Sequence, residues 1–340
     1  MTKFAVDKNM EQAPTIHDIT ETQERSVRAR FGSFVQKQGA LVLLVLVCII
    51  ATARYEAFLS PENLLNVLRQ NSMLGIIAVG MTFVILTGGI DLSVGSLLAV
   101  AGVTAAFLAP QGLFIALIAA VAATTFLGLI NGVIIAKARI QPFIVTLGMM
   151  IAARGLALAV TDEKNVRIPA SATDFSWLGQ GELFGFLPVP ILILIIAYAV
   201  FWLVLNYTRF GRHVFAVGDN DEAARLMGLN INRVTILVYA ISGLLAGLAG
   251  VILASRLNTG SPVEGVGREL DAIASVVVGG TLLTGGKGSL ISTLYGVLLL
   301  GVIFNIFNLE GQISPWWQLV LRGAILLAVV VMQNRLTKVN

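Results

Sequence analysis

Long apolar runs, separated by short polar segments, fill most of this 340-residue chain. A helix needs about 20 mostly apolar residues to cross the hydrocarbon core of a bilayer. Runs that approach this length predict an all-α polytopic membrane protein with about ten transmembrane helices. They cover residues 39–54, 72–88, 92–109, 113–136, 143–160, 189–205, 234–254, 272–284, 289–309 and 316–333.

The composition excludes most other classes of protein. Charged residues make up 12% of the chain and hydrophobic residues 56%, whereas soluble domains are about 25% charged. So few charges argue against a soluble enzyme and against a nucleic-acid-binding protein, despite the net charge of +4. One cysteine, Cys48, and two distant histidines, His17 and His213, form no recognisable metal cluster. We therefore expect no catalytic residues, no metal site and no cofactor.

The distribution of lysine and arginine predicts the orientation, because cytoplasmic loops carry an excess of both. With the N-terminus in the cytoplasm, 15 of the 23 basic residues lie inside and 6 outside, while Arg154 and Arg322 fall within spans. We therefore expect both termini in the cytoplasm.

Three regions follow from this topology. Residues 1–38 are expected to form a disordered cytoplasmic tail, residues 39–334 the transmembrane domain, and residues 335–340 a cytoplasmic C-terminal tail. The first run ends in Ala-Thr-Ala (51–53), as a signal-peptidase site would. The polar segment before it is too long and too mixed in charge for a signal peptide, so we expect a retained span.

The largest predicted cytoplasmic loop, residues 206–233, contains the signature of a short helix. Asp219 suits the N-cap, and Glu222 three positions later completes a capping-box-like pair. Gly228 suits the helix end. Two turns are too short to be stable alone, so this helix must pack on its own protein or dock a cytoplasmic partner. The residues alone leave both readings open.

Two glycine-rich segments interrupt apolar runs. The first glycine break is residues 88–95 (GGIDLSVG), and the second is residues 279–286 (GGTLLTGG); both fit Gly-Gly-x-x-Leu-[Ser/Thr]-x-Gly. Paired interruptions of this kind are a pointer to the path of a transporter. Glycines that let helices pack closely are the alternative. The breaks fall on the second and eighth spans, an offset that does not match a simple five-plus-five repeat.

Polar residues within the spans are the other candidates for a path. Asp91 and Arg154 carry charge that is costly at membrane depth, although an arginine bonded to backbone carbonyls would be structural. Asparagines supply most of the remaining polarity, which suits an uncharged, hydroxyl-rich solute. The predicted path residues are Gly88, Gly89, Asp91, Gly95, Asn131, Arg154, Gly279, Gly280 and Asn305.

Residues 281–288 (TLLTGGKG) approach the phosphate-binding P-loop but lack its first glycine and its final Ser or Thr. This chain is therefore not expected to hydrolyse ATP.

Four segments, residues 78–96, 130–155, 208–233 and 269–289, resemble the permease subunits of bacterial ABC importers for monosaccharides, in the ribose-type branch. The resemblance implies a type II-like permease in the inner membrane, surrounded by lipid and paired with a second permease copy or a paralogue. It also implies a cytoplasmic ATPase subunit that uses the ATP, and a periplasmic sugar-binding protein.

The sequence Glu222-Ala223-Ala224 followed by Gly228 is similar to the core of the EAA loop of such importers, which favours the docking reading of the short helix. The residues implied in ATPase coupling are Gly218, Asp219, Asn220, Glu222, Ala223, Ala224, Arg225 and Gly228.

The expected function is therefore a permease subunit that forms the path for a simple sugar, such as ribose or a related pentose or hexose. A permease for another sugar-like solute or a nucleoside is an alternative. A different class, the ion-coupled secondary transporter, would be expected to place several carboxylates within its spans, where this chain offers only Asp91.

Overall fold

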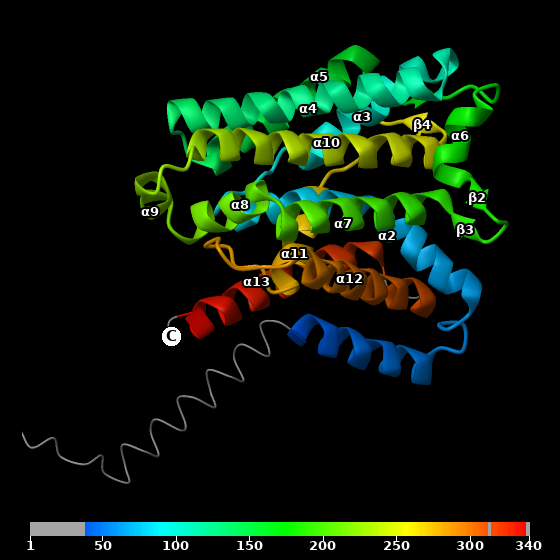
Figure 1. Ribbon diagram of the computed structural model, residues 1–340. Helices are drawn as coiled ribbons and strands as arrows, with labels where there is room; N and C mark the ends of the chain where they lie inside the picture. The colour runs from blue at the N-terminus through cyan, green and yellow to red at the C-terminus, as the bar shows by residue number, and fades with distance from the viewer. Residues whose placement is uncertain (1–37, 312–313, 338–340) are drawn as a thin grey trace, which may run out of the picture.

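A computed structural model describes residues 38–311 and 314–337 of the chain as a bundle of helices with two small sheets at one end (Figure 1). After a first helix, Gln38–Arg54, the longer helices are α2 (Pro61–Leu86), α3 (Val94–Leu108), α4 (Leu113–Ala138), α5 (Pro142–Thr161), α7 (Val189–Tyr207), α10 (Ile231–Leu257), α12 (Leu290–Glu310) and α13 (Pro315–Thr337). The shorter elements are η1 (Ala109–Gln111), β1 (Val166–Arg167), α6 (Thr173–Gln180), β2 (Glu182–Leu183), β3 (Leu187–Pro188), α8 (Arg209–Asp219), α9 (Asp221–Leu226), β4 (Thr259–Gly260) and α11 (Arg268–Val278).

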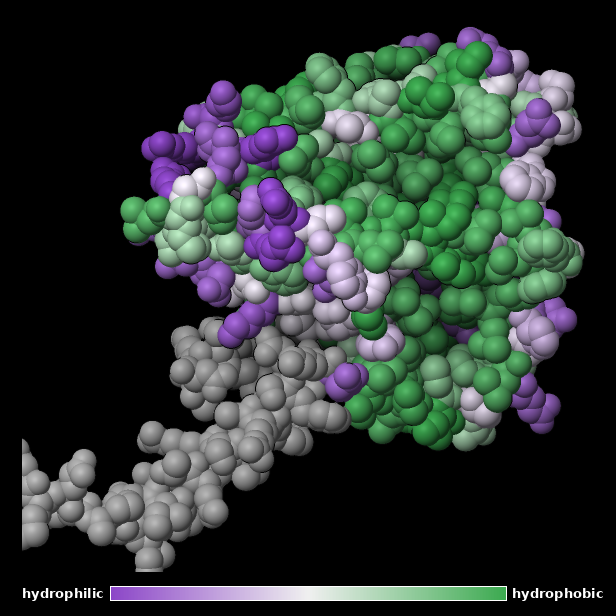
Figure 2. All heavy atoms as spheres, viewed as in Figure 1, coloured by the Kyte–Doolittle hydropathy of each residue, from purple (hydrophilic) through white to green (hydrophobic). Residues whose placement is uncertain are grey.

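Seven of the predicted spans coincide with described helices that are long and apolar enough to cross a membrane. These spans correspond to α2, α3 with η1, α4, α5, α7, α10 and α12. The space-filling view agrees with this, since apolar side chains cover the middle of the visible face and polar ones gather at its left and right ends (Figure 2). The chain is therefore a multi-span membrane protein.

The other three predicted spans differ from these seven. The helix Gln38–Arg54 is apolar but shorter. Run 316–333 lies within α13, and the side chain of Arg322 is outside the described part of the chain, as are residues 1–37 and 338–340 of the predicted tails.

Hydropathy predicts that run 272–284 is a spanning helix, but in the structure it is not a single helix. It contains most of α11, which has 11 residues and is only about 16 Å long at 1.5 Å per residue. The helix then ends at the second glycine break. This correction has a local cause: Gly280 has a φ of +96°, a conformation that favours glycine and stops a helix.

Helix α10 is the centre of the bundle and packs most extensively against α4, α3 and α2. Glycines permit a close approach of α10 to α4. A Cβ added at Gly128 of α4 would lie 3.1 Å from the Cα of Gly243 in α10. The two backbones therefore touch, as small residues spaced four apart allow.

The two ends of the bundle are different in kind (Figure 1). Helices α8 and α9 lie at one end, called here the α9 end. Helix α6, the antiparallel hairpin β2–β3 and the antiparallel pair β1–β4 lie at the other, the α6 end. The helix Gln38–Arg54 begins, and α13 finishes, on the side of the α9 end.

Candidate functional site

The two glycine breaks and the end of α8 meet at one point. The amide N–H of Gly286 donates a 3.0 Å hydrogen bond to the carbonyl oxygen of Leu86, the last residue of α2. Gly218, in the last turn of α8, lies against both: an added Cβ there would overlap the Leu86 oxygen and come within 2.6 Å of the Gly286 nitrogen. We call these residues, with Gly88 and Gly285, the glycine junction.

Gly285 shows how closely the three segments approach. A Cβ added to it would lie 2.9 Å from the carbonyl oxygen of Gly218, 2.9 Å from the amide nitrogen of Gly88 and 3.0 Å from the Leu86 oxygen. Its φ of +87° also disfavours any side chain. The contact is thus backbone on backbone, and a displacement of α8 cannot leave the two breaks unmoved.

Both breaks start with the same type of helix cap. After α2, Gly88 has a φ of +76° and the N–H of Gly89 donates 3.0 Å to the Val84 carbonyl. After α11, Gly280 has a φ of +96° and the N–H of Thr281 donates 3.2 Å to the Val276 carbonyl. This is the Schellman pattern. Gly88 therefore corresponds to Gly280 in conformation, one residue away from the Gly88–Gly279 match that the sequence motif predicts.

Asp91 is fully buried within the first break. Its Oδ1 accepts hydrogen bonds from the backbone N–H of Ser93 at 2.9 Å and from the Ser93 hydroxyl at 2.6 Å. Its Oδ2 accepts one from the hydroxyl of Ser242 in α10 at 2.7 Å. None of the ion pairs in the described part of the chain includes Asp91. Neutral donors therefore hold this carboxyl group.

Asn131 of α4 extends the same network, because its Nδ2 donates 3.0 Å to the Ser93 hydroxyl. Thr146 of α5 donates to the carbonyl of Ile90 at 3.2 Å. Asp91 and Asn131 are both 0% exposed, so in this conformation neither can touch a solute. In this conformation both residues fix the first break to α4 and α10, and their place in the path stays a prediction.

Arg154 bonds to backbone carbonyls, the structural alternative that the sequence left open. Its Nη1 donates to the carbonyls of Pro262 and Glu264 at 2.5 and 2.7 Å, and its Nη2 to that of Gly95 at 3.4 Å. It thereby ties the loop before α11 to the start of α3. Gly95 leaves the space for this loop, since an added Cβ would overlap the carbonyl oxygen of Gly265.

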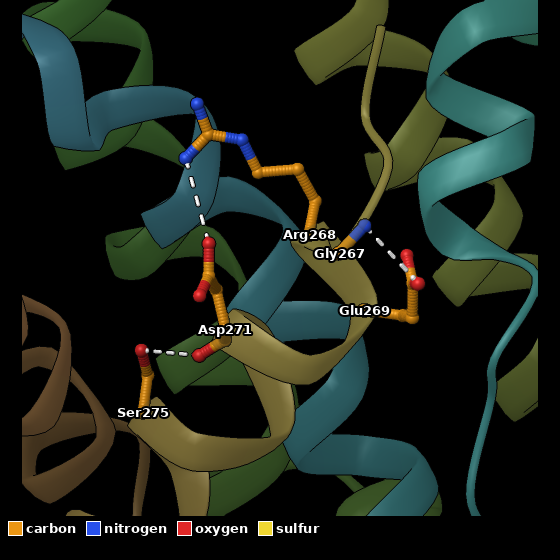
Figure 3. A network of polar contacts seen from close by, with 5 residues as sticks. All are labelled: Gly267, Arg268, Glu269, Asp271 and Ser275. Carbon is orange, nitrogen blue, oxygen red and sulfur yellow. Dashed lines mark hydrogen bonds and ion pairs between the residues drawn. The ribbon is translucent and has the colours of Figure 1, made fainter. Parts of the chain in front are cut away.

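The first turn of α11 carries its charges on opposite sides (Figure 3). Glu269 accepts the N–H of Gly267 at 3.2 Å, and Arg268 lies 3.7 Å from the carboxylate of Asp271. Ser275 donates to the Asp271 carbonyl at 2.8 Å. Arg154 thus holds the loop before the helix, and Gly279 at the end of the helix packs on Ser292 of α12.

Asn305 does not join the other predicted path residues. It exchanges two hydrogen bonds, of 2.8 and 3.1 Å, with Asn63 in the first turn of α2. That turn is at the opposite end of α2 from the glycine junction. The predicted set therefore divides: Gly88, Gly89, Asp91, Gly95 and Asn131 lie in or against the first break, Gly279 and Gly280 in the second, and Asn305 away from both.

The predicted short helix exists as α9, but its cap is Asn220 rather than Asp219. The Oδ1 of Asn220 accepts the N–H of Ala223 at 2.9 Å. Asp219 is instead the last residue of α8. This amphipathic helix was not predicted from the sequence of the loop. Gly228 follows the end of α9 with a φ of +81°, as predicted. Glu222 is exposed at the positive end of the helix.

The faces of α9 differ in exposure. Ala224 is fully buried against its own chain, whereas Leu226 is 89% exposed and Met227 70%. The neighbouring Ala223 and Arg225 are also exposed. A partner would thus contact the apolar pair after Arg225, which the motif did not single out, and would not reach Ala224. The cap Asn220 follows Gly218 of the glycine junction by two residues.

No group of three or more His, Cys, Asp or Glu in the described part of the chain is placed to hold a metal ion. What the site can do is mechanical: the end of α8 contacts the end of α2 and the second glycine break through backbone atoms.

Comparisons with known proteins agree on the family. Residues 63–330 match the family described as branched-chain amino acid transport system / permease component. The chain is similar to the ribose import permease protein RbsC of Escherichia coli K12, with 43% identity over 92% of this chain and 99% of that protein. It is also similar to RbsC of Bacillus subtilis 168 (41%; 93% and 98%) and to the L-arabinose transport system permease protein AraH of E. coli K12 (40%; 88% and 91%). No solved structure matches the chain.

A family match over most of the chain, relatives that align almost end to end and a bundle of spanning helices lead to the same conclusion. This chain belongs to the family of transport-system permease components, and it is a multi-pass membrane permease.

Proposed function

We propose that this chain is the transmembrane permease subunit of an ATP-binding-cassette importer and forms the path for a simple sugar, ribose or a related pentose or hexose. The observation that carries the proposal is the glycine junction, where Gly218 joins the loop segment 206–233 to both glycine breaks. The relatives named above as ribose and arabinose permeases support a sugar as the solute.

The proposed partner at the α9 end is a cytoplasmic ATPase subunit. Leu226 and Met227 expose apolar surface on a helix that is too short to be stable alone, and such surfaces mark interaction sites. ATP binding would then draw the α9 helices of two permease copies, identical or paralogous, toward each other. The shift passes through α8 to the junction and changes access to the path.

The remaining parts of the proposal follow from this orientation. The α9 end and both termini face the cytoplasm, and the α6 end receives the sugar from a periplasmic binding protein in a bacterial inner membrane. The spans have a type II-like arrangement in which α11 does not cross the membrane alone, and the chain uses no cofactor of its own, because the partner subunit consumes the ATP.

Two alternatives remain distinct from this proposal. A permease for a nucleoside or another sugar-like solute would use the same machinery. An ion-coupled secondary transporter would need acidic groups that a coupling ion can reach, and the fully buried Asp91, bonded to three neutral donors, does not favour that mechanism.

Uptake by the reconstituted complex tests the solute. The chain, its ATPase and its binding protein are placed in proteoliposomes, and ATP-dependent uptake of labelled ribose, arabinose and leucine is compared. We expect uptake of a pentose or hexose and none of leucine. Uptake of leucine alone would contradict the sugar assignment and would favour the solute in the family's description.

A further inference from the structure

The first glycine break is held by residues that lie outside the loop segment 206–233. Asp91, at its centre, is bonded to Ser93 within the break and to Ser242 in α10. Asn131 in α4 reaches the same Ser93 hydroxyl. All four residues are at most 1% exposed. Two helices distant in sequence therefore hold this break, α10 by a bond to the Asp91 carboxyl group and α4 by a bond to Ser93.

The two helices that hold this group behave as one body. Gly128 and Gly243 bring the backbones of α4 and α10 into contact, and Gly132 does the same one turn away, where an added Cβ would lie 2.7 Å from the Cα of Ile236. A displacement of α10 must carry α4 with it. Ser242 and Asn131 then move together, and with them the break that they hold.

Helix α10 also follows α9 after a short connection. Only Met227 to Asn230 separate them, and Asn230 caps α10 by accepting the N–H of Arg233 at 3.0 Å. A shift of α9 thus reaches the first break by two routes. One is the glycine junction through α8, and the other is α10 through Ser242.

We propose that Ser242 and Asn131 are positioning residues that hold the Asp91 carboxyl group, Ser242 directly and Asn131 through the Ser93 hydroxyl, so that displacement of α10 is passed to the first glycine break during transport. This inference rests on the proposed function. It assigns Asp91 a mechanical role rather than contact with the sugar. The buried carboxyl group makes the link stiff, because each donor that is removed leaves a buried acceptor unsatisfied.

The variant Ser242→Ala tests this link in the reconstituted complex with ATPase and binding protein. It should leave assembly and stimulated ATP hydrolysis in place but lower the sugar imported per ATP by about tenfold, a factor within the range for leaving one buried acceptor unsatisfied. Asn131→Leu, which has a similar size and no donor, should lower the ratio in the same direction. A residue that merely supported the fold would lower hydrolysis and import together.

Ser72→Ala is the matched control. Ser72 is equally buried, but its hydroxyl donates within its own helix, to Leu68 at 2.7 Å. Its ratio of sugar to ATP should equal that of the unaltered chain. Ser242→Cys, which keeps the size of the side chain and a weak donor, should give an intermediate ratio.

Two results would overturn the inference: an unchanged ratio in Ser242→Ala, or loss of ATPase assembly in both Ser242 variants, since that would make the role structural. An unaltered chain that imports no sugar would instead contradict the proposed function itself, and the inference with it.

Discussion

The amide N–H of Gly286 donates a hydrogen bond to the carbonyl oxygen of Leu86 at 3.0 Å, and this bond joins the second glycine break to the end of the helix before the first. Gly218 packs on both partners of the bond. A single residue of α8 thereby contacts two segments that lie far apart in the chain. The expected consequence is that changes at this contact impair coupling more than changes of equal size elsewhere.

Gly218→Ala, which adds a single methyl group, should strongly impair both stability and transport. Its Cβ would overlap the Leu86 oxygen and lie 2.6 Å from the Gly286 nitrogen, and backbone atoms cannot move aside cheaply. We expect a loss of about 1–3 kcal/mol in the free energy of unfolding, as for overpacking, and loss of uptake. Thermal unfolding and uptake by the reconstituted complex are the measurements. Gly148→Ala, in α5 with open space around the glycine, is the control and should behave as the unaltered chain.

Gly89→Ala should impair transport through a steric clash, and a second substitution, at Tyr239, should relieve that clash. A Cβ at Gly89 would collide with the hydroxyl of Tyr239 in α10, and that hydroxyl has no hydrogen-bond partner among the described residues. Tyr239→Phe should therefore be nearly neutral alone and should restore uptake to Gly89→Ala. Failure of the double variant to recover would mean that the break needs glycine for its conformation rather than for space.

The sequence predicted the elements that hydropathy controls. Seven spans follow from apolar runs that are long enough, and α9 follows from its capping residues and Gly228. Hydropathy could not distinguish α11 from a span, because the residues after Gly279 remain apolar while the backbone turns away. The cap of α9 is Asn220 rather than the predicted Asp219, because α8 continues to Asp219. An amphipathic helix directly before the capping motif was not predicted from the sequence.

The site itself was only partly predictable. The glycines of the junction were singled out separately, but their contact is between backbones and leaves no pattern in the spacing. Asp91 could be singled out because a charge is costly within the membrane, whereas its partner Ser242 is an ordinary serine in an apolar helix. Asn305 was grouped with the path because its polarity is the same, and only the structure shows its pairing with Asn63.

The cap of α9 can be tested directly. Asn220→Ala removes the acceptor for the N–H of Ala223 and should cost about 1 kcal/mol, which a helix of six residues cannot easily lose. We expect less ATPase to copurify with this variant, while membrane insertion is unchanged. Asp219→Ala, which removes the neighbouring side chain but no cap, should copurify a normal amount. Equal copurification by both would show that the cap does not limit docking.

Arg154 should stabilise the loop before α11. Arg154→Gln cannot reproduce its bonds to the carbonyls of Pro262 and Glu264, and hydrogen bonds from charged groups are worth about 1.5–3 kcal/mol each. A lower melting temperature and faster hydrogen exchange at residues 261–267 are expected in detergent-purified protein. The exposed Lys164→Gln, which removes the same charge, should change neither. Unaltered exchange in Arg154→Gln would contradict this stabilising role.

The orientation can be measured by thiol labelling. A cysteine placed at Ser171, in the exposed segment before α6, should react with a membrane-impermeant reagent in intact cells when Cys48 is replaced by alanine. A cysteine at Asn220 should react only after the cells are made permeable. The reverse pattern would invert the topology and place α9 outside, where no ATPase could reach it.

The energy source tests the central claim most directly. Proteoliposomes that contain the chain, its ATPase and its sugar-loaded binding protein should import sugar when ATP is available to the ATPase subunit. Import should persist when ionophores dissipate all ion gradients, and it should stop in the Gly218→Ala variant. Sugar import that needs an ion gradient, and that proceeds without ATP or the ATPase subunit, would contradict the account.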